Sequence, residues 1–148
     1  MNRKRYILVT DPGLKRFTFQ SVGVKGNVVK AIEYTPVEVS GLKLYNLGFG
    51  DLNNFSDEFD DLSISNNGDR DKILSTVAAT VLDFTRYFPG ALIYVEGSTS
   101  TRTRLYQMAL RANIEEINKV LSVFGLLKGT WFPFKENVNY EAFMVLRK

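Results

Sequence analysis

The sequence predicts an α+β fold, in which a mixed sheet of five to six strands is covered by two long helices. Three observations support this prediction: alternating apolar segments before residue 50, two later segments with helical periodicity, and two apolar segments near the C-terminal end. The 148 residues are 45% hydrophobic and 13% aromatic. This is enough apolar material for one core without metal or disulfide support. We therefore expect residues 1–148 to form a single globular domain.

The first third of the chain predicts an antiparallel three-stranded meander. Asp11-Pro12-Gly13 indicates a turn, after which apolar and polar residues alternate. Lys25-Gly26-Asn27 indicates a hairpin connection, and Pro36 with Ser40-Gly41 marks the next turn. The predicted strands are residues 16–24, 28–34 and 42–49.

Residues 51–71 have no regular periodicity and are rich in Asn, Asp, Ser and Gly. A polar segment of this length is longer than most loops of compact domains, and long ordered loops tend to be functional or flexible. The segment therefore separates the meander from the rest of the predicted fold.

The remaining elements follow in the order helix-strand-helix-strand-strand. Asp69 is the expected N-cap of the first helix, whose apolar residues recur at helical spacing until Pro89-Gly90. The second helix is expected from about residue 101 to 124, with Gly125 as its C-terminal cap. A strand that runs parallel to residues 91–96 after this helix would complete a right-handed crossover. The predicted strands are residues 91–96, 126–134 and 140–147.

The composition excludes several chemistries. Without cysteine the chain has no disulfide and no thiolate nucleophile, and without histidine it has no Ser-His-Asp triad and no His-ligated metal. Any catalysis would depend on carboxylates, lysine, tyrosine or arginine, so we expect a binding protein rather than an enzyme, with no cofactor and no bound metal. The longest apolar stretches are shorter than the roughly 18 residues that span a bilayer, so we expect a cytoplasmic protein without membrane contact.

The net charge of +3 hides an uneven distribution. Residues 1–50 hold eight Lys or Arg against three acids, residues 51–71 hold one against seven, and residues 72–148 hold ten against six. The acidic middle segment contains enough carboxylates for calcium or magnesium, but their spacing fits no EF-hand. A net charge of this size does not by itself indicate nucleic acid binding.

The strongest functional pattern is the turn at residues 97–104, Gly-Ser-Thr-Ser-Thr-Arg-Thr-Arg, between the strand at 91–96 and the second helix. A helix N-terminus offers unpaired amides and a partial positive charge, which favour an anion. We expect a phosphate-bearing ligand or nucleic acid here, held by hydroxyls and by arginine forks. The expected ligand-binding residues are Ser98, Thr99, Ser100, Arg102, Arg104 and Arg111.

A structural interpretation of the same turn remains open. Ser100 or Thr101 would then only cap the helix, and the arginines would lie in solvent or pair with Glu96 and the acidic segment. The turn fits neither the dinucleotide-binding spacing nor the P-loop spacing.

Two other functions also remain open. A carboxylate- and metal-dependent nuclease or phosphoryl hydrolase would use Asp51, which follows Gly48-Phe49-Gly50, together with Glu96. A protein-interaction module, for example one half of a bacterial toxin-antitoxin or regulatory pair, would present the acidic segment to a basic partner. Aromatic residues at strand alternation are assigned to the core rather than to base stacking.

Several segments together resemble a family of small uncharacterised proteins from Bacteroidota. The likeness spans nearly the whole chain and depends on Phe19-Gln-Ser-Val-Gly23, Tyr45-Asn-Leu-Gly-Phe-Gly-Asp51, Ser65-Asn-Asn-Gly-Asp69, Gly97-Ser-Thr99, Arg102-Thr-Arg-Leu-Tyr106 and Tyr140-Glu-Ala-Phe143. The resemblance implies a bacterial domain of unknown function and supplies no substrate, cofactor or catalytic residue.

Overall fold

A computed structural model describes residues 4–24, 26–39, 41–52, 59–60 and 69–148. Within these ranges it contains three helices and nine strands, and all nine strands belong to one sheet. In chain order the elements are β1 (Val9–Thr10), β2 (Arg16–Gly23), β3 (Gly26–Val39), β4 (Leu42–Leu52), β5 (Phe59–Asp60), α1 (Arg70–Tyr87), β6 (Leu92–Val95), α2 (Ser100–Ala112), α3 (Ile114–Val120), β7 (Leu121–Leu127), β8 (Thr130–Pro133) and β9 (Ala142–Arg147).

The predicted meander is present as β2, β3 and β4, which pair antiparallel. β3 is longer than expected because it continues through Pro36. The amide of Tyr34 donates to the carbonyl of Lys15 at 2.8 Å on the β2 side of β3, so the nitrogen two residues later faces the same side. β2 pairs with β3 only up to Glu33, so the missing N–H of Pro36 leaves no partner unsatisfied.

The sheet is mixed, as expected, but its parallel pair is not the predicted one. β6 pairs parallel with β4 through Tyr45 and Asn46, and α1 forms the crossover between these two strands. The strand after α2 and α3, β7, does not neighbour β6, because β9 lies between them and pairs antiparallel with both. The strand order is β1-β2-β3-β4-β6-β9-β7-β8, with β5 paired to β4 off this path, so the sheet is larger than the predicted five to six strands.

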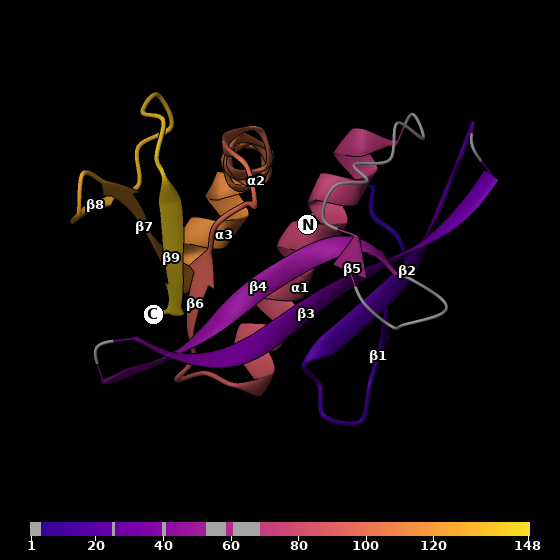
Figure 1. Ribbon diagram of the computed structural model, residues 1–148, viewed down its shortest axis with the longest axis horizontal. Coiled ribbons are helices and arrows are strands. Elements are labelled where there is room, and N and C mark those ends of the chain that lie inside the picture. Colours follow the sequence, from indigo (N-terminus) through magenta and orange to yellow (C-terminus); the bar gives the residue numbers. More distant parts are fainter. Residues whose placement is uncertain (1–3, 25, 40, 53–58, 61–68) are drawn as a thin grey trace.

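The helices pack against one face of the sheet. Figure 1 shows α1 and α3 behind β4 and β6, with α2 seen end-on above β6. Along each central strand every second side chain points to the helices, for example Leu47 on β4 and Val145 on β9. These side chains meet Val81 of α1 and Tyr106 of α2 in a single buried cluster. The other face of the sheet is therefore free of helices in the described part of the chain.

The predicted long helix over residues 101–124 is wrong in its second half. α2 ends at Ala112, α3 is a separate short helix, and β7 begins at Leu121. The buried Asn113 marks the break, where its side-chain amide donates to the carbonyl of Ala109 at 2.8 Å. From Leu121 onwards buried and half-buried residues alternate, which is the periodicity of a strand. The apolar residues just before Leu121 fit a helical spacing as well, and this concealed the change from helix to strand in the sequence.

Gly125 is not a helix cap. It lies within β7, where a Cβ atom would stand 2.2 Å from the ring of Tyr140. The glycine is therefore required by a close side-chain contact across the sheet.

Asp69 occupies the N-cap position of α1, as predicted, but its side chain makes no capping hydrogen bond. The carboxylate instead accepts hydrogen bonds from the hydroxyls of Tyr6 and Ser21. Asp69 thus ties the start of α1 to the N-terminal segment and to β2. No helix in the described ranges combines the length and the apolar character needed to cross a membrane.

Candidate site at the N-terminus of α2

The turn between β6 and α2 is held by a close contact between Gly97 and Thr103. The amide of Gly97 donates to the hydroxyl of Thr103 at 3.0 Å, and that hydroxyl donates to the carbonyl of Thr99 at 3.2 Å. A Cβ atom on Gly97 would lie 2.4 Å from the amide nitrogen of Thr103. Only glycine allows the chain to approach the first turn of α2 so closely.

Thr99 is the N-cap of α2, one or two residues earlier than expected. Its hydroxyl oxygen accepts a hydrogen bond from the amide of Arg102 at 3.2 Å. The amides of Ser100 and Thr101 belong to the first helical turn, where intrahelical acceptors do not exist, and the described residues supply none. Within the described part of the chain, the start of α2 therefore keeps two donors without a partner, together with its partial positive charge.

A surface pocket of about 440 Å³ lies at this helix end. Four of the six residues expected to bind a ligand line it together: Ser98, Thr99, Ser100 and Arg104. The structure also brings one distant segment to the site, residues 139–141, which the sequence did not predict there. The additional lining residues are Glu96, Gly97, Thr103, Gln107, Asn139, Tyr140 and Glu141.

Gln107 forms one wall of the pocket and is fixed by two hydrogen bonds. This buried side chain donates to the carbonyl of Val138 and accepts from the amide of Tyr140 at 3.2 Å. The two hydrogen bonds join α2 to the segment before β9. They hold Asn139 and Glu141 against the pocket.

The charges around the pocket are mixed. Arg104 is exposed and forms no ion pair with any described residue. Glu96 accepts a hydrogen bond from the hydroxyl of Tyr94 at 2.6 Å, and Glu141 accepts one from the amide of Lys128 at 2.7 Å. Burial, the hydrogen bond to Glu96 and the negative charges of both glutamates raise the pKa of Tyr94 to about 12. Tyr94 is therefore a neutral donor at physiological pH.

Arg102 does not line this pocket. Its side chain is 4% exposed and runs to β4, where Nη1 donates to the carbonyl of Phe49 at 3.2 Å. Nη2 is buried without a hydrogen-bond partner among the described residues. β4 pairs with β6 only at Tyr45 and Asn46 and with β5 only at Asp51 and Leu52, so the carbonyl lies on the open stretch between them. Arg102 thus anchors α2 to this strand edge.

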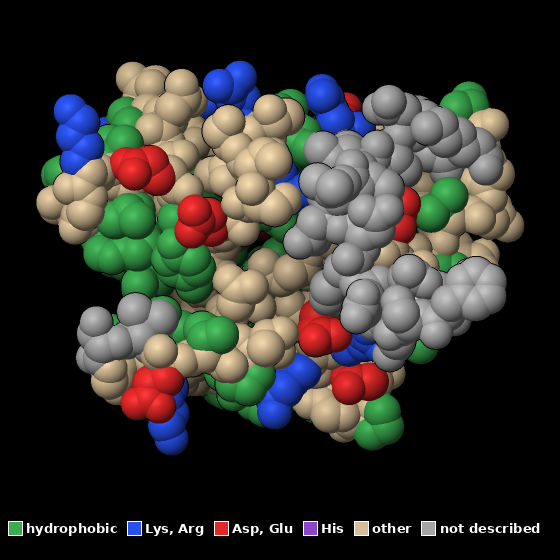
Figure 2. Space-filling view, in the orientation of Figure 1, with side chains coloured by type: hydrophobic (Ala, Val, Ile, Leu, Met, Phe, Trp, Pro, Cys, Tyr) green, Lys and Arg blue, Asp and Glu red, His purple; other side chains and the backbone are tan. Residues whose placement is uncertain are grey.

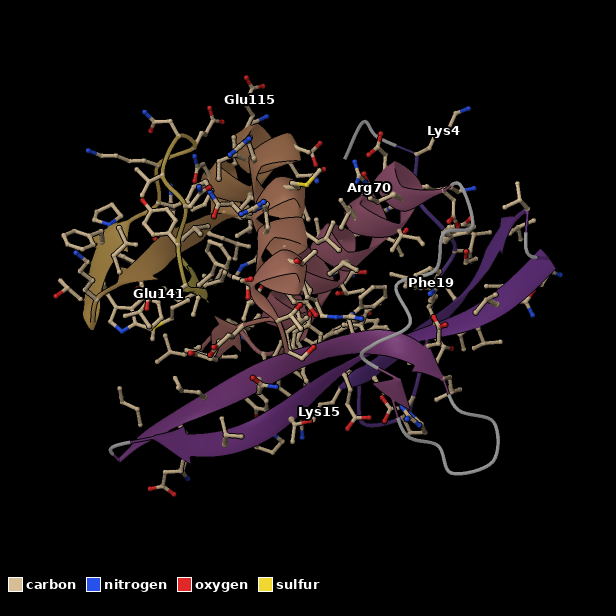
Figure 3. All side chains as sticks on the ribbon, turned by 45° about the horizontal axis from the view of Figure 1, so that its top comes forward. Lys4, Lys15, Phe19, Arg70, Glu115 and Glu141 are labelled. Atoms are coloured by element: carbon tan, nitrogen blue, oxygen red, sulfur yellow. The ribbon has the colours of Figure 1, made fainter. Side chains whose placement is uncertain are left out.

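Asp51, one of the two residues expected to act in the hydrolase alternative, also has a structural partner. Its carboxylate pairs with the ammonium group of Lys30, which is 1% exposed and lies 6.0 Å from the centre of the Phe49 ring. Glu96, the other of these two residues, is engaged with Tyr94 instead. Figure 3 shows Phe19, the cross-strand neighbour of Lys30, well apart from Glu141 at the pocket. In the described ranges no group of three acidic residues is placed to hold a metal ion.

Arg111 lies in a different part of the surface. Its Nη2 donates to the carbonyl of Glu136 at 2.8 Å. It lines a separate pocket of about 360 Å³ together with Glu115, Glu116 and Glu136. Arg104 and Arg111 therefore face two separate pockets, and three glutamates surround Arg111. Three residues of the acidic segment, Asp57, Glu58 and Asp61, lie outside the described residues. Asp60 belongs to β5, where its backbone is the cross-strand partner of Asp51 in β4.

The comparison with known families gives one match. The chain belongs to a family of unknown function, DUF6934, whose sequence model matches residues 2–148. No curated protein and no solved structure matches the chain.

Proposed function

We propose that this family member binds a small phosphate-bearing molecule in the pocket at the N-terminus of α2. The observation that supports the proposal is the position of Arg104 beside Ser98, Thr99 and Ser100 in one open pocket. Amides and a guanidinium that have no partner among the described residues together favour a doubly charged oxyanion. The phosphate group would occupy this end of the pocket.

The opposite charges at the pocket favour a small ligand over nucleic acid. Glu96 and Glu141 line the same pocket, and a continuous phosphate backbone would meet their repulsion. Carboxylates are good acceptors for hydroxyl groups, as in ribose recognition by acidic residues. We therefore infer a phosphate monoester that carries hydroxyl groups, such as a sugar phosphate or a nucleoside monophosphate.

The proposed activity is binding without catalysis. Asp51 and Glu96 have separate structural partners, so the geometry favours binding over a metal-dependent hydrolase. The lack of cysteine suits a reducing compartment, which is why we place the protein in the bacterial cytoplasm.

Amide NMR tests the proposal with three probes: ribose 5-phosphate, inorganic phosphate and unphosphorylated ribose. We expect ribose 5-phosphate to shift the amide signals of residues 98–104 first and in a saturable manner. Inorganic phosphate should shift the same signals with lower affinity, and ribose alone should have little effect. Shifts spread evenly over the protein, or none at residues 98–104, would exclude this site.

Arg104→Gln should weaken binding of ribose 5-phosphate by roughly tenfold or more, because a charge-assisted hydrogen bond contributes about 1.5–3 kcal/mol. Arg86→Gln is the matched control. Arg86 is an exposed helical arginine that pairs with Asp83 at the far end of α1. Equal affinities of the two variants would refute the assigned role of Arg104.

Arg111→Gln separates a small ligand from a polymeric one. Arg111 is held by Glu136 in another pocket, so a compact phosphate monoester should bind this variant with unchanged affinity. A loss comparable to that of Arg104→Gln would indicate a longer ligand that follows α2.

A further inference from the structure

A third pocket lies on the face of the sheet that carries no helix. It has a volume of about 520 Å³. The lining residues are Val37, Leu42, Leu44, Asn46, Tyr94, Trp131 and Met144. None of these side chains is charged, and the polar groups are the amide of Asn46, the hydroxyl of Tyr94 and the indole N–H of Trp131. The pocket is therefore chemically unlike the one at α2.

The strand pairing explains why these residues meet. Leu44 and Val37 are cross-strand neighbours near the tip of the β3–β4 hairpin, and Tyr94 is paired with Met144 across β6 and β9. Figure 2 shows hydrophobic side chains over β8 and β9 and over the end of this hairpin, with acidic side chains beside the first group. The short pairing of β4 with β6 brings the hairpin tip below β8.

Two aromatic rings form adjacent walls of this pocket. The centroids of Tyr94 and Trp131 are 6.2 Å apart, and their planes cross at 82°. Both side chains are only partly buried, although Trp131 is the one tryptophan of the sequence. Aromatic faces carry negative electrostatic potential and attract organic cations, tryptophan most strongly.

Two carboxylates act on the hydroxyl group of Tyr94, although both line the pocket at α2 rather than this one. Glu96 accepts the hydrogen bond from the Tyr94 hydroxyl at 2.6 Å, and Glu141 acts on the same hydroxyl through its charge. No lysine or arginine lines the pocket. Negative charge beside one wall of an apolar, aromatic pocket favours a ligand that is both cationic and poorly hydrated.

We propose that the pocket between Tyr94 and Trp131 binds a methylated ammonium group, such as the trimethylammonium group of choline or of a trimethylated lysine. The methyl groups pack against Leu44 and Met144, and the spread positive charge faces the two rings. A primary ammonium binds more weakly because it keeps its water.

The single tryptophan makes the test direct. Choline should change the fluorescence of Trp131 in a saturable manner. Its uncharged carbon isostere, in which a tert-butyl group replaces the trimethylammonium group, should bind about tenfold more weakly or worse, a difference of about 1.4 kcal/mol. A short peptide with trimethyllysine should bind more tightly than choline if the natural source is a protein, and less tightly if it is a free metabolite.

Two variants localise the effect. Glu96→Gln combined with Glu141→Gln should lower choline affinity severalfold and leave the affinity for the isostere unchanged, because both glutamates are exposed and the rings remain. Trp131→Leu should remove the preference for choline over its isostere. Because this variant has no tryptophan, binding is measured by the methyl NMR signal of Met144. Equal binding of choline and its isostere by the unmodified protein would overturn the proposal, as would a preference that survives Trp131→Leu.

Discussion

Nη1 of Arg102 donates a hydrogen bond to the carbonyl oxygen of Phe49 at 3.2 Å, which joins the first turn of α2 to the open edge of β4. The contact supplies a hydrogen-bond donor to a stretch of the β4 backbone that pairs with neither β5 nor β6. It also fixes the orientation of the helix end that lines the proposed phosphate pocket. The arginine nearest the cap is therefore a positioning residue, and Arg104 is the one that faces the pocket.

Arg102→Ala should destabilise the protein by roughly 2–4 kcal/mol, because it leaves the Phe49 carbonyl unpaired and opens a cavity. Urea denaturation measures the change in the free energy of unfolding. Arg104→Ala, two residues along the same helix and exposed, is the control and should stay within about 0.5 kcal/mol of the unmodified protein. Similar losses in both variants would contradict the anchoring role.

Asp51→Asn should destabilise the protein by about 3 kcal/mol, because it leaves the buried ammonium of Lys30 without its carboxylate. Adding Lys30→Met should restore part of the loss, since the pair is then replaced by an uncharged core. Asp71→Asn, an exposed acid in the first turn of α1, is the control. If the changes in the free energy of unfolding of the two single variants simply add in the double variant, the two charges do not interact.

This stability effect also bears on the hydrolase alternative. A loss of any activity in Asp51→Asn has to be compared with the fraction of folded protein. Only a loss in fully folded variant protein would support a catalytic Asp51.

The stability of the protein should fall as the pH rises from about 10 to about 12, through ionisation of Tyr94. Its pKa is raised to about 12 in the folded protein, so the unfolded chain releases this proton first and is favoured in that range. Tyr94→Phe should lose the corresponding part of the pH dependence. Glu96→Gln should lower the pKa of Tyr94, which the ultraviolet absorbance of tyrosinate would report; an unchanged titration would rule out the contact.

Gly97→Ala should displace the start of α2, because the new Cβ would lie 2.4 Å from a backbone nitrogen that cannot rotate away. We expect a loss of roughly 1–3 kcal/mol and a clear reduction in phosphate binding. Gly90→Ala is a suitable control, since an added Cβ there meets no atom within 4 Å. Unchanged amide NMR signals of residues 98–104 in Gly97→Ala would contradict the close approach.

The amino-acid sequence by itself determined the local features of this protein. Alternating apolar residues in 16–49 specified the meander, and helical spacing after Asp69 specified α1. Each pattern follows from the side-chain periodicity within a single strand or helix. The glycine and the hydroxyl residues at 97–100 predicted the turn and the helix start from cap preferences alone. The buried ion pair of Lys30 was not predicted, although a lysine at a core-facing position of an alternating strand is a signal that could have indicated it.

Tertiary structure decided the remaining features, since they depend on which distant segments pack together. The strand β9 enters between β6 and β7, and this long-range pairing brings Glu141 to the pocket at α2. The open edge of β4 draws Arg102 inward while Arg104 stays outside, although both belong to the same turn. Helical periodicity alone cannot tell which of the two arginines is buried and which lines the pocket, because this depends on the segment that packs against each side of the helix.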